Sequence, residues 1–82
     1  MENGGNMKID RARGIAPFVI ANGQEIRSSL PCSIEAFLVA QDLLPRSVVV
    51  EHNGEAVAPS EFARRQLHAG DRLEIVMIVA GG

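Results

Sequence analysis

The sequence predicts an α+β domain in which one main helix packs across one face of a mixed sheet of four to five strands. Two Asn-Gly pairs, Asn22-Gly23 and Asn53-Gly54, each lie between β-prone runs and indicate two hairpins. A segment with helical periodicity separates them, and an apolar run over Leu73–Val79 supplies a last strand. This order of elements is typical of a sheet covered by a helix on one side.

Composition limits the fold to one small domain with an aliphatic core. The 82 residues are 46% apolar, but they include only three Phe and neither Trp nor Tyr. The formal charge is -2, and acidic and basic residues are interspersed. Nucleic-acid binding normally needs a basic stripe with stacking aromatics, so we expect no nucleic-acid partner.

The sequence predicts a cytoplasmic protein without a membrane contact. A single cysteine, Cys32, cannot form an internal disulfide, and no basic segment followed by an apolar one marks a secretion signal. No apolar run approaches the roughly 20 residues that span a bilayer.

Residues 1–16 differ in character from the domain expected over residues 17–82. They are rich in Asn, Gly and charged side chains, so we expect a flexible arm, part of which could come from an expression vector. Arg11 and Arg13 could contact an anionic partner, although short charged arms are usually only solvated.

The first hairpin is expected to join strands over Phe18–Ala21 and Gln24–Ser29, the second ended by Pro31, which lacks a backbone donor. A helix then begins after Ser33, whose hydroxyl can accept from the first helical amides. Pro45 is expected to end this helix after about twelve residues. Its apolar face is predicted to contain Ile34, Phe37, Leu38 and Leu44.

The second half begins with Ser47–Glu51, a β-branched run without strict alternation, which predicts a strand with neighbours on both sides. After the second Asn-Gly pair, Glu55–Ala58 forms its hairpin partner. Pro59 starts a helical turn that brings Phe62 and Leu67 onto the core.

These elements assemble into the β-grasp arrangement. A helix that crosses the sheet after a hairpin returns the chain beside the first strand, normally by a right-handed crossover. We therefore expect the last strand at the centre of the sheet. Alternation places Leu73, Ile75, Met77 and Val79 on one face and Glu74, Val76, Ile78 and Ala80 on the other. On that second face, Val76 and Ile78 are either covered by a loop or exposed as an apolar patch.

No arrangement of side chains predicts a catalytic or a metal site. His52 and His68 flank turns without the spacing of metal ligands, and both are expected to be ordinary surface residues. Cys32 lies near the predicted helix start, which can lower the pKa of a thiol, but a buried or incidental thiol is the simpler interpretation. No pair of carboxylates is placed for acid and base work. We expect a protein on which enzymes act, not an enzyme.

The chain ends in Gly81-Gly82, directly after the apolar strand. Residues without a Cβ can pass through a slot that excludes side chains. The segment Ile78–Gly82 spans at most roughly 17 Å. It could carry the terminal carboxylate into a partner's active site, although the two glycines alone also fit a frayed terminus.

The sequence VVVEHNGEAVAPSEFARRQLHAGDRLEIVMIVAGG, Val48 to Gly82, resembles ThiS, the bacterial sulfur carrier of thiamine biosynthesis. The resemblance lies in the order of its parts. These are a strand, an Asn-Gly turn, Val-Ala-Pro, a helical turn with an aromatic residue, Gly-Asp, an apolar strand and a terminal Gly-Gly. A weaker resemblance extends back to Pro17.

The resemblance implies a ubiquitin-like sulfur carrier that binds no cofactor itself. The Gly82 carboxylate would be adenylated with ATP by a ThiF-like enzyme and converted to a thiocarboxylate, using a sulfur donor such as a cysteine desulfurase. The thiocarboxylate would give its sulfur to a ThiG-like thiazole synthase. Gly81 would let the tail thread into these enzymes, and the apolar face of Val76, Ile78 and Ala80 is the expected docking surface.

Two other functions stay open at this point. MoaD, the small subunit of molybdopterin synthase, shares the fold and the thiocarboxylate chemistry. Proteins of that group often carry Phe or Pro just before the tail, whereas Val76–Ala80 contains neither. The second alternative is a ubiquitin-like interaction module that forms no thiocarboxylate.

Overall fold

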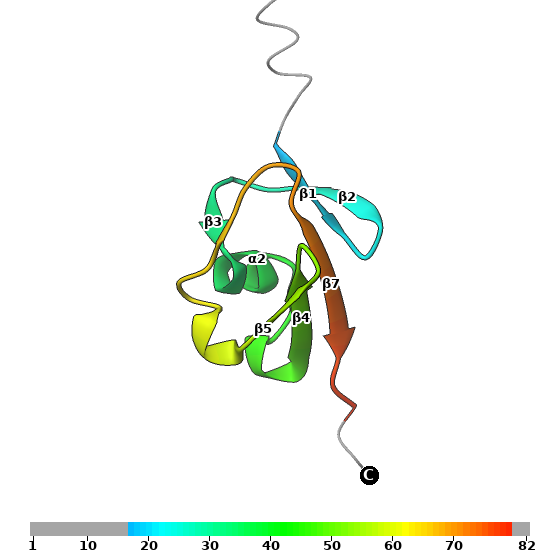
Figure 1. Cartoon of the computed structure of the whole chain (residues 1–82), viewed down its shortest axis with the longest axis vertical. Coiled ribbons are helices and arrows are strands. Elements are labelled where there is room, and N and C mark those ends of the chain that lie inside the picture. Colours follow the sequence, from blue (N-terminus) through cyan, green and yellow to red (C-terminus); the bar gives the residue numbers. More distant parts are fainter. Residues whose placement is uncertain (1–16, 80–82) are drawn as a thin grey trace, which may run out of the picture.

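The computed structural model describes residues 17–79 of the chain. Five strands form the main sheet, and one helix packs across one face of it (Figure 1). The predicted α+β architecture is therefore confirmed. The elements are β1 (Phe18–Ala21), β2 (Gln24–Arg27), β3 (Cys32–Ser33), α2 (Ile34–Ala40), the 3₁₀ turn η1 (Pro45–Ser47), β4 (Val48–His52), β5 (Glu55–Val57), the 3₁₀ turn η2 (Pro59–Glu61), β6 (Gln66–Leu67) and β7 (Arg72–Met77).

The main sheet has the strand order β2-β1-β7-β4-β5, so the last strand lies at its centre. β7 runs parallel to β1 and antiparallel to β4, and the hairpins β1-β2 and β4-β5 flank it. This is the β-grasp topology that the order of elements predicted. A second, two-stranded sheet of β3 and β6 was not predicted.

Both hairpins turn at their Asn-Gly pairs. Asn22 and Gly23 have φ angles of 51° and 82°, and Asn53 and Gly54 have 52° and 85°. Positive φ at both central residues defines the type I′ turn, whose twist matches that of the flanking strands. The two hairpin predictions are therefore confirmed.

The start of α2 follows the prediction. The Ser33 hydroxyl accepts a hydrogen bond of 3.0 Å from the backbone N–H of Ala36, which satisfies one donor of the first helical turn. Ile34, Phe37 and Leu38 are buried against the sheet.

The predicted end of the helix is wrong. α2 ends at Ala40 and does not continue to Pro45, which instead begins η1. Leu44 was expected on the apolar face of the helix, but it follows the helix and is 57% exposed. A proline prevents the helix from passing it, but it does not require the helix to reach it.

Asp42 explains the early end. Its φ of 61° is left-handed, so the chain turns out of the helix there. The backbone N–H of Leu43 then donates to the Leu38 carbonyl over 2.9 Å, and that of Asp42 donates to Val39 over 3.0 Å. These two bonds form a Schellman motif, which satisfies the last helical carbonyls.

The bounds of four strands also differ from the prediction. β2 ends at Arg27 instead of Ser29, and β7 spans Arg72–Met77 instead of Leu73–Val79. β4 spans Val48–His52 instead of Ser47–Glu51, and β5 ends at Val57 instead of Ala58. β4 has neighbours on both sides, as expected. Its burial alternates strictly, however, which leaves Val49 54% exposed on the face away from the helix.

One aliphatic core lies between α2 and the sheet. Strand residues enter it at alternate positions, because successive side chains of a strand point to opposite faces. Phe62 and Leu67 belong to it, as predicted. The buried apolar residues are Val19, Ala21, Ile34, Phe37, Leu38, Val48, Val50, Val57, Phe62, Leu67 and Leu73.

Candidate functional site at the end of the last strand

β7 has neighbours on both sides at its beginning and on one side at its end. Arg72 and Leu73 pair with β1, whereas the pairing with β4 runs on to the end of the strand, from His52 opposite Leu73 to Val48 opposite Met77. β1 turns into its hairpin beside the middle of β7. The second half of β7 therefore extends past its parallel neighbour.

Asn22 takes the place of a strand residue at this point. Its backbone N–H donates to the Leu73 carbonyl over 2.9 Å. Its side-chain amide then bonds to both backbone groups of Ile75: Nδ2 donates to the carbonyl over 3.0 Å, and Oδ1 accepts from the N–H over 2.7 Å. The sequence predicted the turn role of Asn22 but not this contact, because the two residues are 53 positions apart.

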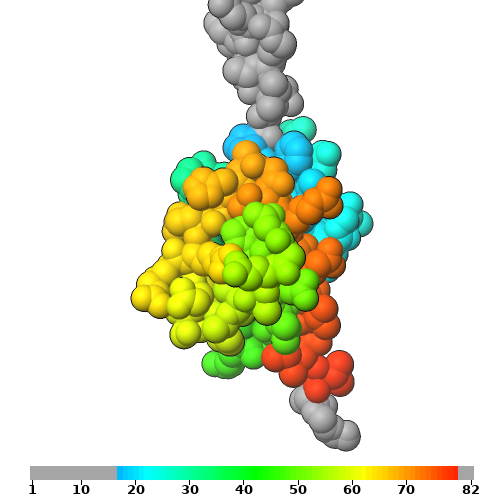
Figure 2. Space-filling view, in the orientation of Figure 1, coloured from blue at the N-terminus to red at the C-terminus, as the bar shows by residue number. Residues whose placement is uncertain are grey.

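The chain leaves the sheet beside η1. The backbone N–H of Ile78 donates to the Ser47 carbonyl over 2.8 Å and so continues the contact with the β4 side by one residue. Val79 is 86% exposed. The surface at the end of β7, red in Figure 2, projects from the body of the domain. The last strand therefore directs the chain away from the fold at Val79.

The exposed face of β7 is apolar near this exit. Leu73 is buried and Ile75 half-buried on the helix side, as the alternation predicted. Val76 and Ile78 are 61% and 53% exposed, so no loop covers them among residues 17–79. Val49 lies opposite Val76 on β4 and is also exposed. Of the two alternatives for this face, the exposed apolar patch is the one observed.

The remaining predicted site residues lie outside the described part of the chain. They are Ala80 of the docking surface, Gly81 and Gly82. The arm expected over residues 1–16 also lies outside it. Their roles stay predictions.

The prediction that His52 is an ordinary surface residue is wrong. The residue is 6% exposed and lies between two charged side chains. Arg65 Nε donates to His52 Nδ1 over 2.9 Å, and His52 Nε2 lies 2.8 Å from Asp71 Oδ2. Because a guanidinium can only donate, Nδ1 must be the acceptor and Nε2 must carry the proton. The bonds thus fit a neutral ring that donates to Asp71.

Strand alternation could have revealed this. Val48 and Val50 point to the core, and His52 is the next residue on the same face of β4. The position of His52 beside a turn suggested an exposed residue, and its partners lie 13 and 19 residues away along the chain.

Two carboxylates belong to this cluster. Burial alone would raise the pKa of Asp71, but hydrogen bonds from His52, the His68 backbone and Asn53 outweigh it and hold the pKa below its ordinary value. On the outer side, Arg65 binds Glu55 and lowers the pKa of that carboxyl through a hydrogen bond and its charge. The hydrogen-bonding groups of these side chains are paired with one another, so we interpret the cluster as a structural clamp.

Other candidate groups show no site. Within residues 17–79, no three His, Cys, Asp or Glu side chains lie together as metal ligands, and no helix is long and apolar enough to cross a membrane. His68 is exposed, as predicted. The thiol of Cys32 is half-buried and lies 3.9 Å from the Ser28 hydroxyl.

A sequence model of the ThiS family matches residues 17–82. The chain belongs to the ThiS family. The family indicated by the ordered motifs between Val48 and Gly82 is thus confirmed.

This ThiS-family chain is also similar to part of a larger protein. It is 38% identical over 64 residues to a thiazole synthase of Paramagnetospirillum magneticum (strain ATCC 700264 / AMB-1). The match covers 78% of this chain but 20% of that protein, so the chain spans about a fifth of the length of the curated relative it matches.

Two solved structures share the fold of this ThiS-family chain. The crystal structure of the thiamine biosynthesis protein ThiS from Geobacter metallireducens has a TM-score of 0.69 at 24% identity, covering 79% of this chain and 99% of that one. A solution structure of a thiamine biosynthesis protein from the same organism has a TM-score of 0.66 at 24% identity, with coverages of 79% and 87%. They confirm the ubiquitin-like β-grasp architecture.

Proposed function

We propose that this protein is the sulfur carrier of thiamine biosynthesis, with the Gly82 carboxylate as its reactive group. A ThiF-like enzyme adenylates that carboxylate, a sulfur donor converts it to a thiocarboxylate, and a thiazole synthase receives the sulfur. The protein is a co-substrate in these reactions, not an enzyme, and the cytoplasm is where they would occur.

The chemistry requires activation because a carboxylate is a poor electrophile. An α-carboxyl group has a pKa of about 3.3 to 3.7 and is ionised at neutral pH. One carboxylate oxygen attacks the α-phosphorus of ATP and releases pyrophosphate. A nucleophile at the oxidation level of sulfide then attacks the acyl carbon and displaces AMP, which carries that oxygen away. The product is a thiocarboxylate that differs from the starting chain by sulfur in place of oxygen.

The exit of β7 carries this proposal. Ile78 is the last residue whose backbone bonds to the body among the described residues. The four residues that follow it span at most roughly 14 Å when extended. A tail of that length can reach the active site of a partner that contacts the domain close to Ile78.

The relative from Paramagnetospirillum magneticum supports a thiazole synthase as the sulfur acceptor. That protein is named a thiazole synthase, and the segment similar to this chain makes up 20% of it. Joining two domains raises their effective concentration for each other, which favours pairs that act in sequence. We therefore propose a thiazole synthase as the partner of this chain as well.

Intact mass spectrometry tests the proposal. The purified chain is incubated with ATP, a ThiF-like enzyme and sodium sulfide, and we expect the mass to rise by the difference between sulfur and oxygen. The product should transfer sulfur to a thiazole synthase and not to the large subunit of molybdopterin synthase. No mass change with an enzyme that thiolates its own carrier would refute the sulfur-carrier proposal and favour a plain interaction module.

Deleting Gly82 provides the matched control. The shortened chain still ends in a glycine carboxylate, but that carboxylate lies about 3.5 Å nearer the domain. We expect adenylation to be lost and the thermal unfolding midpoint to stay unchanged. A large fall in the midpoint would mean that the tail is part of the fold instead.

A further inference from the structure

One backbone position on β7 faces an open edge. Alternate residues of a strand in an antiparallel ladder direct both backbone groups to the same side. Arg72 and Ile78 bond toward β4, so the even-numbered residues face that side. Ile75 faces the β1 side, where Asn22 binds both of its groups. Met77 is the next residue on this side, and no residue between 17 and 79 pairs with it there.

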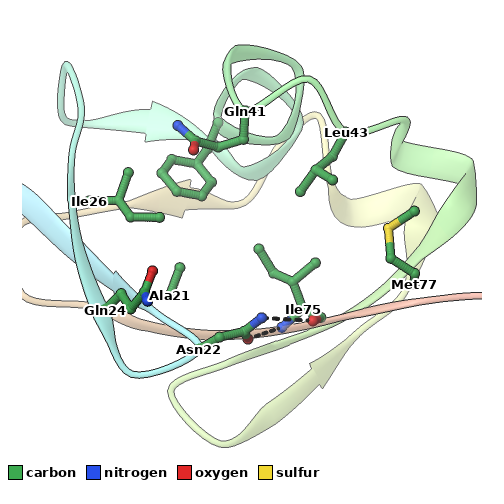
Figure 3. A pocket seen from close by; sticks show the side chains of 9 residues that line it. Ala21, Asn22, Gln24, Ile26, Gln41, Leu43, Ile75 and Met77 are labelled. Carbon is green, nitrogen blue, oxygen red and sulfur yellow. Dashed lines mark hydrogen bonds between the residues drawn. The ribbon is translucent and has the colours of Figure 1, made fainter.

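A groove opens beside this edge. It has a volume of about 260 Å³ and lies between the β1-β2 hairpin, the end of α2 and β7 (Figure 3). Ile26, Leu43 and Met77 point into it from three sides, and Gln24 and Gln41 lie at its rim (Figure 3). No side chain that lines it is ionisable, although 22% of the whole chain is charged. The groove therefore suits an uncharged side chain.

We propose that the activating enzyme adds an extended segment of its own chain to the open edge of β7 at Met77. This inference rests on the proposed function and names how the partner holds the same site. The segment's backbone bonds to the N–H and C=O of Met77. One apolar side chain of the segment enters the groove on the helix side.

Strand geometry links the edge to the groove. Met77 lies on the helix side of β7, so a residue paired with it also points its side chain to that side. Peptides that add to a sheet edge gain affinity from backbone bonds and specificity from pockets that take alternate side chains. The unpaired backbone groups of Met77 and the groove beside them provide these two contributions.

The position along the chain favours the activating enzyme as the occupant. Only five residues separate Met77 from the end of the chain at Gly82. A segment of the enzyme that pairs with Met77 would also lie beside the residues after Met77. It would keep them extended while the carboxylate reacts with ATP. A second copy of this chain would also meet the edge, but its binding there would bring no ATP to the carboxylate.

Hydrogen exchange of single backbone amides tests the proposal. The ThiF-like enzyme used is one that adenylates the chain by the mass assay, so the proposed function is already established in the sample. We expect the Met77 amide to exchange rapidly in the free protein and at least about tenfold more slowly in the complex. The Val76 and Ile78 amides, which face the β4 side, are internal controls and should change little.

Two variants separate the backbone from the side chain. Met77→Pro removes the N–H that faces the open edge, and the β4-β7 ladder loses no bond because that ladder uses the even-numbered residues. Met77→Ala keeps the N–H and shortens only the side chain. We expect kcat/KM for adenylation to fall about tenfold further in Met77→Pro than in Met77→Ala.

Three results would overturn the inference. A Met77 amide that still exchanges rapidly in a complex that adenylates Gly82 would leave the sulfur-carrier function intact but remove the edge contact. Equal kcat/KM for the two variants would do the same. A Met77 amide already protected in the free protein, more so at higher concentration, would assign the edge to a second copy of this chain. If Met77→Pro fails to fold, the exchange rate of the Met77 amide in the unaltered chain still decides whether the edge contact exists.

Discussion

The two ends of β7 differ in the number of paired neighbours and in the exposure of their side chains. At Arg72 and Leu73 the strand is bonded on both sides, and the clamp formed by His52, Asp71 and Arg65 joins its start to β4 and to the segment before β6. At Val76 and Met77 it is paired with β4 alone, and the side chains from there to Val79 are exposed. Both ends belong to one strand of six residues and share one neighbour, β4.

The difference separates the part of β7 that stabilises the fold from the part that the proposed function would use. Buried apolar contacts and buried hydrogen bonds contribute most of a small domain's free energy of unfolding, and here they concentrate at the first end. The other end can therefore expose apolar surface and backbone groups to a partner with little effect on the fold. Substitutions along one strand should then move stability at the first end and partner activity at the second.

The largest expected effect contrasts Leu73 with Met77. Leu73→Ala should reduce the free energy of unfolding by about 2 to 5 kcal/mol, because Leu73 is 1% exposed and its removal leaves a cavity. Met77→Ala should change it by only about 0.5 kcal/mol, because Met77 is 54% exposed. Urea denaturation measures both. Equal losses would contradict the division of the strand into two regions.

The clamp should give the next largest effect. His52→Ala leaves the Arg65 Nε–H and the Asp71 carboxylate without their buried partner, and we expect a loss of about 2 kcal/mol in the free energy of unfolding. Val49→Ala, on the same strand but exposed, should lose about 0.5 kcal/mol or less. Thiocarboxylate yield below the unfolding temperature should stay normal in His52→Ala. A low yield from the folded variant would show that the clamp also serves the tail.

Asp71 should make the first end sensitive to acid. The pKa of Asp71 lies below its ordinary value of 3.8 in the folded protein, so its charged form contributes stability that is complete above pH 3.8. That contribution disappears as the pH falls through the lower, folded-state pKa. Asp71→Asn should cost about 1.5 kcal/mol at neutral pH.

The comparison requires unfolding curves for the protein and for Asp71→Asn at several pH values from neutral to below 3.8. The difference between the two should shrink at the acid end. A difference that is constant across this range would mean that the carboxylate's charge does not matter to the clamp.

The smallest stability effect, with a clear functional one, is expected at Val76. Val76→Thr keeps the shape of the exposed side chain, so the free energy of unfolding should change by less than about 0.5 kcal/mol. A hydroxyl on the predicted docking surface should raise KM for the activating enzyme about fivefold, as expected for about 1 kcal/mol of lost apolar burial. Glu74→Gln, on the same face but nearer the clamp, is the matched comparison. If KM responds only to Glu74→Gln, the docking surface lies elsewhere on the sheet.

Local signals in the sequence predicted most of this fold. Asn22-Gly23 and Asn53-Gly54 demand positive φ angles at neighbouring residues, and few structures other than a type I′ hairpin supply them. Ser33 similarly begins the helix through a bond within one turn. The central position of β7 followed from the order of these elements.

Features without a recognisable local signal, and those that depend on distant residues, were not predicted. The end of α2 is set by Asp42 in a left-handed conformation, which a search for glycine and proline does not detect. β3 and β6 pair through two residues each and carry no pattern of their own. The burial of His52 depends on Arg65 and Asp71, and only the alternation of β4 could have revealed it.

The side chain of Asn22 has a consequence for the protein in solution. A bare strand edge invites identical molecules to stack along it and aggregate. By covering both groups of Ile75, this amide shortens the bare edge of β7 to the single residue Met77 within the described region. One residue is too little for stacking of identical copies, whereas an enzyme also gains the groove and the tail. Asn22 therefore removes most of one route, the edge of β7, by which copies of this chain could stack.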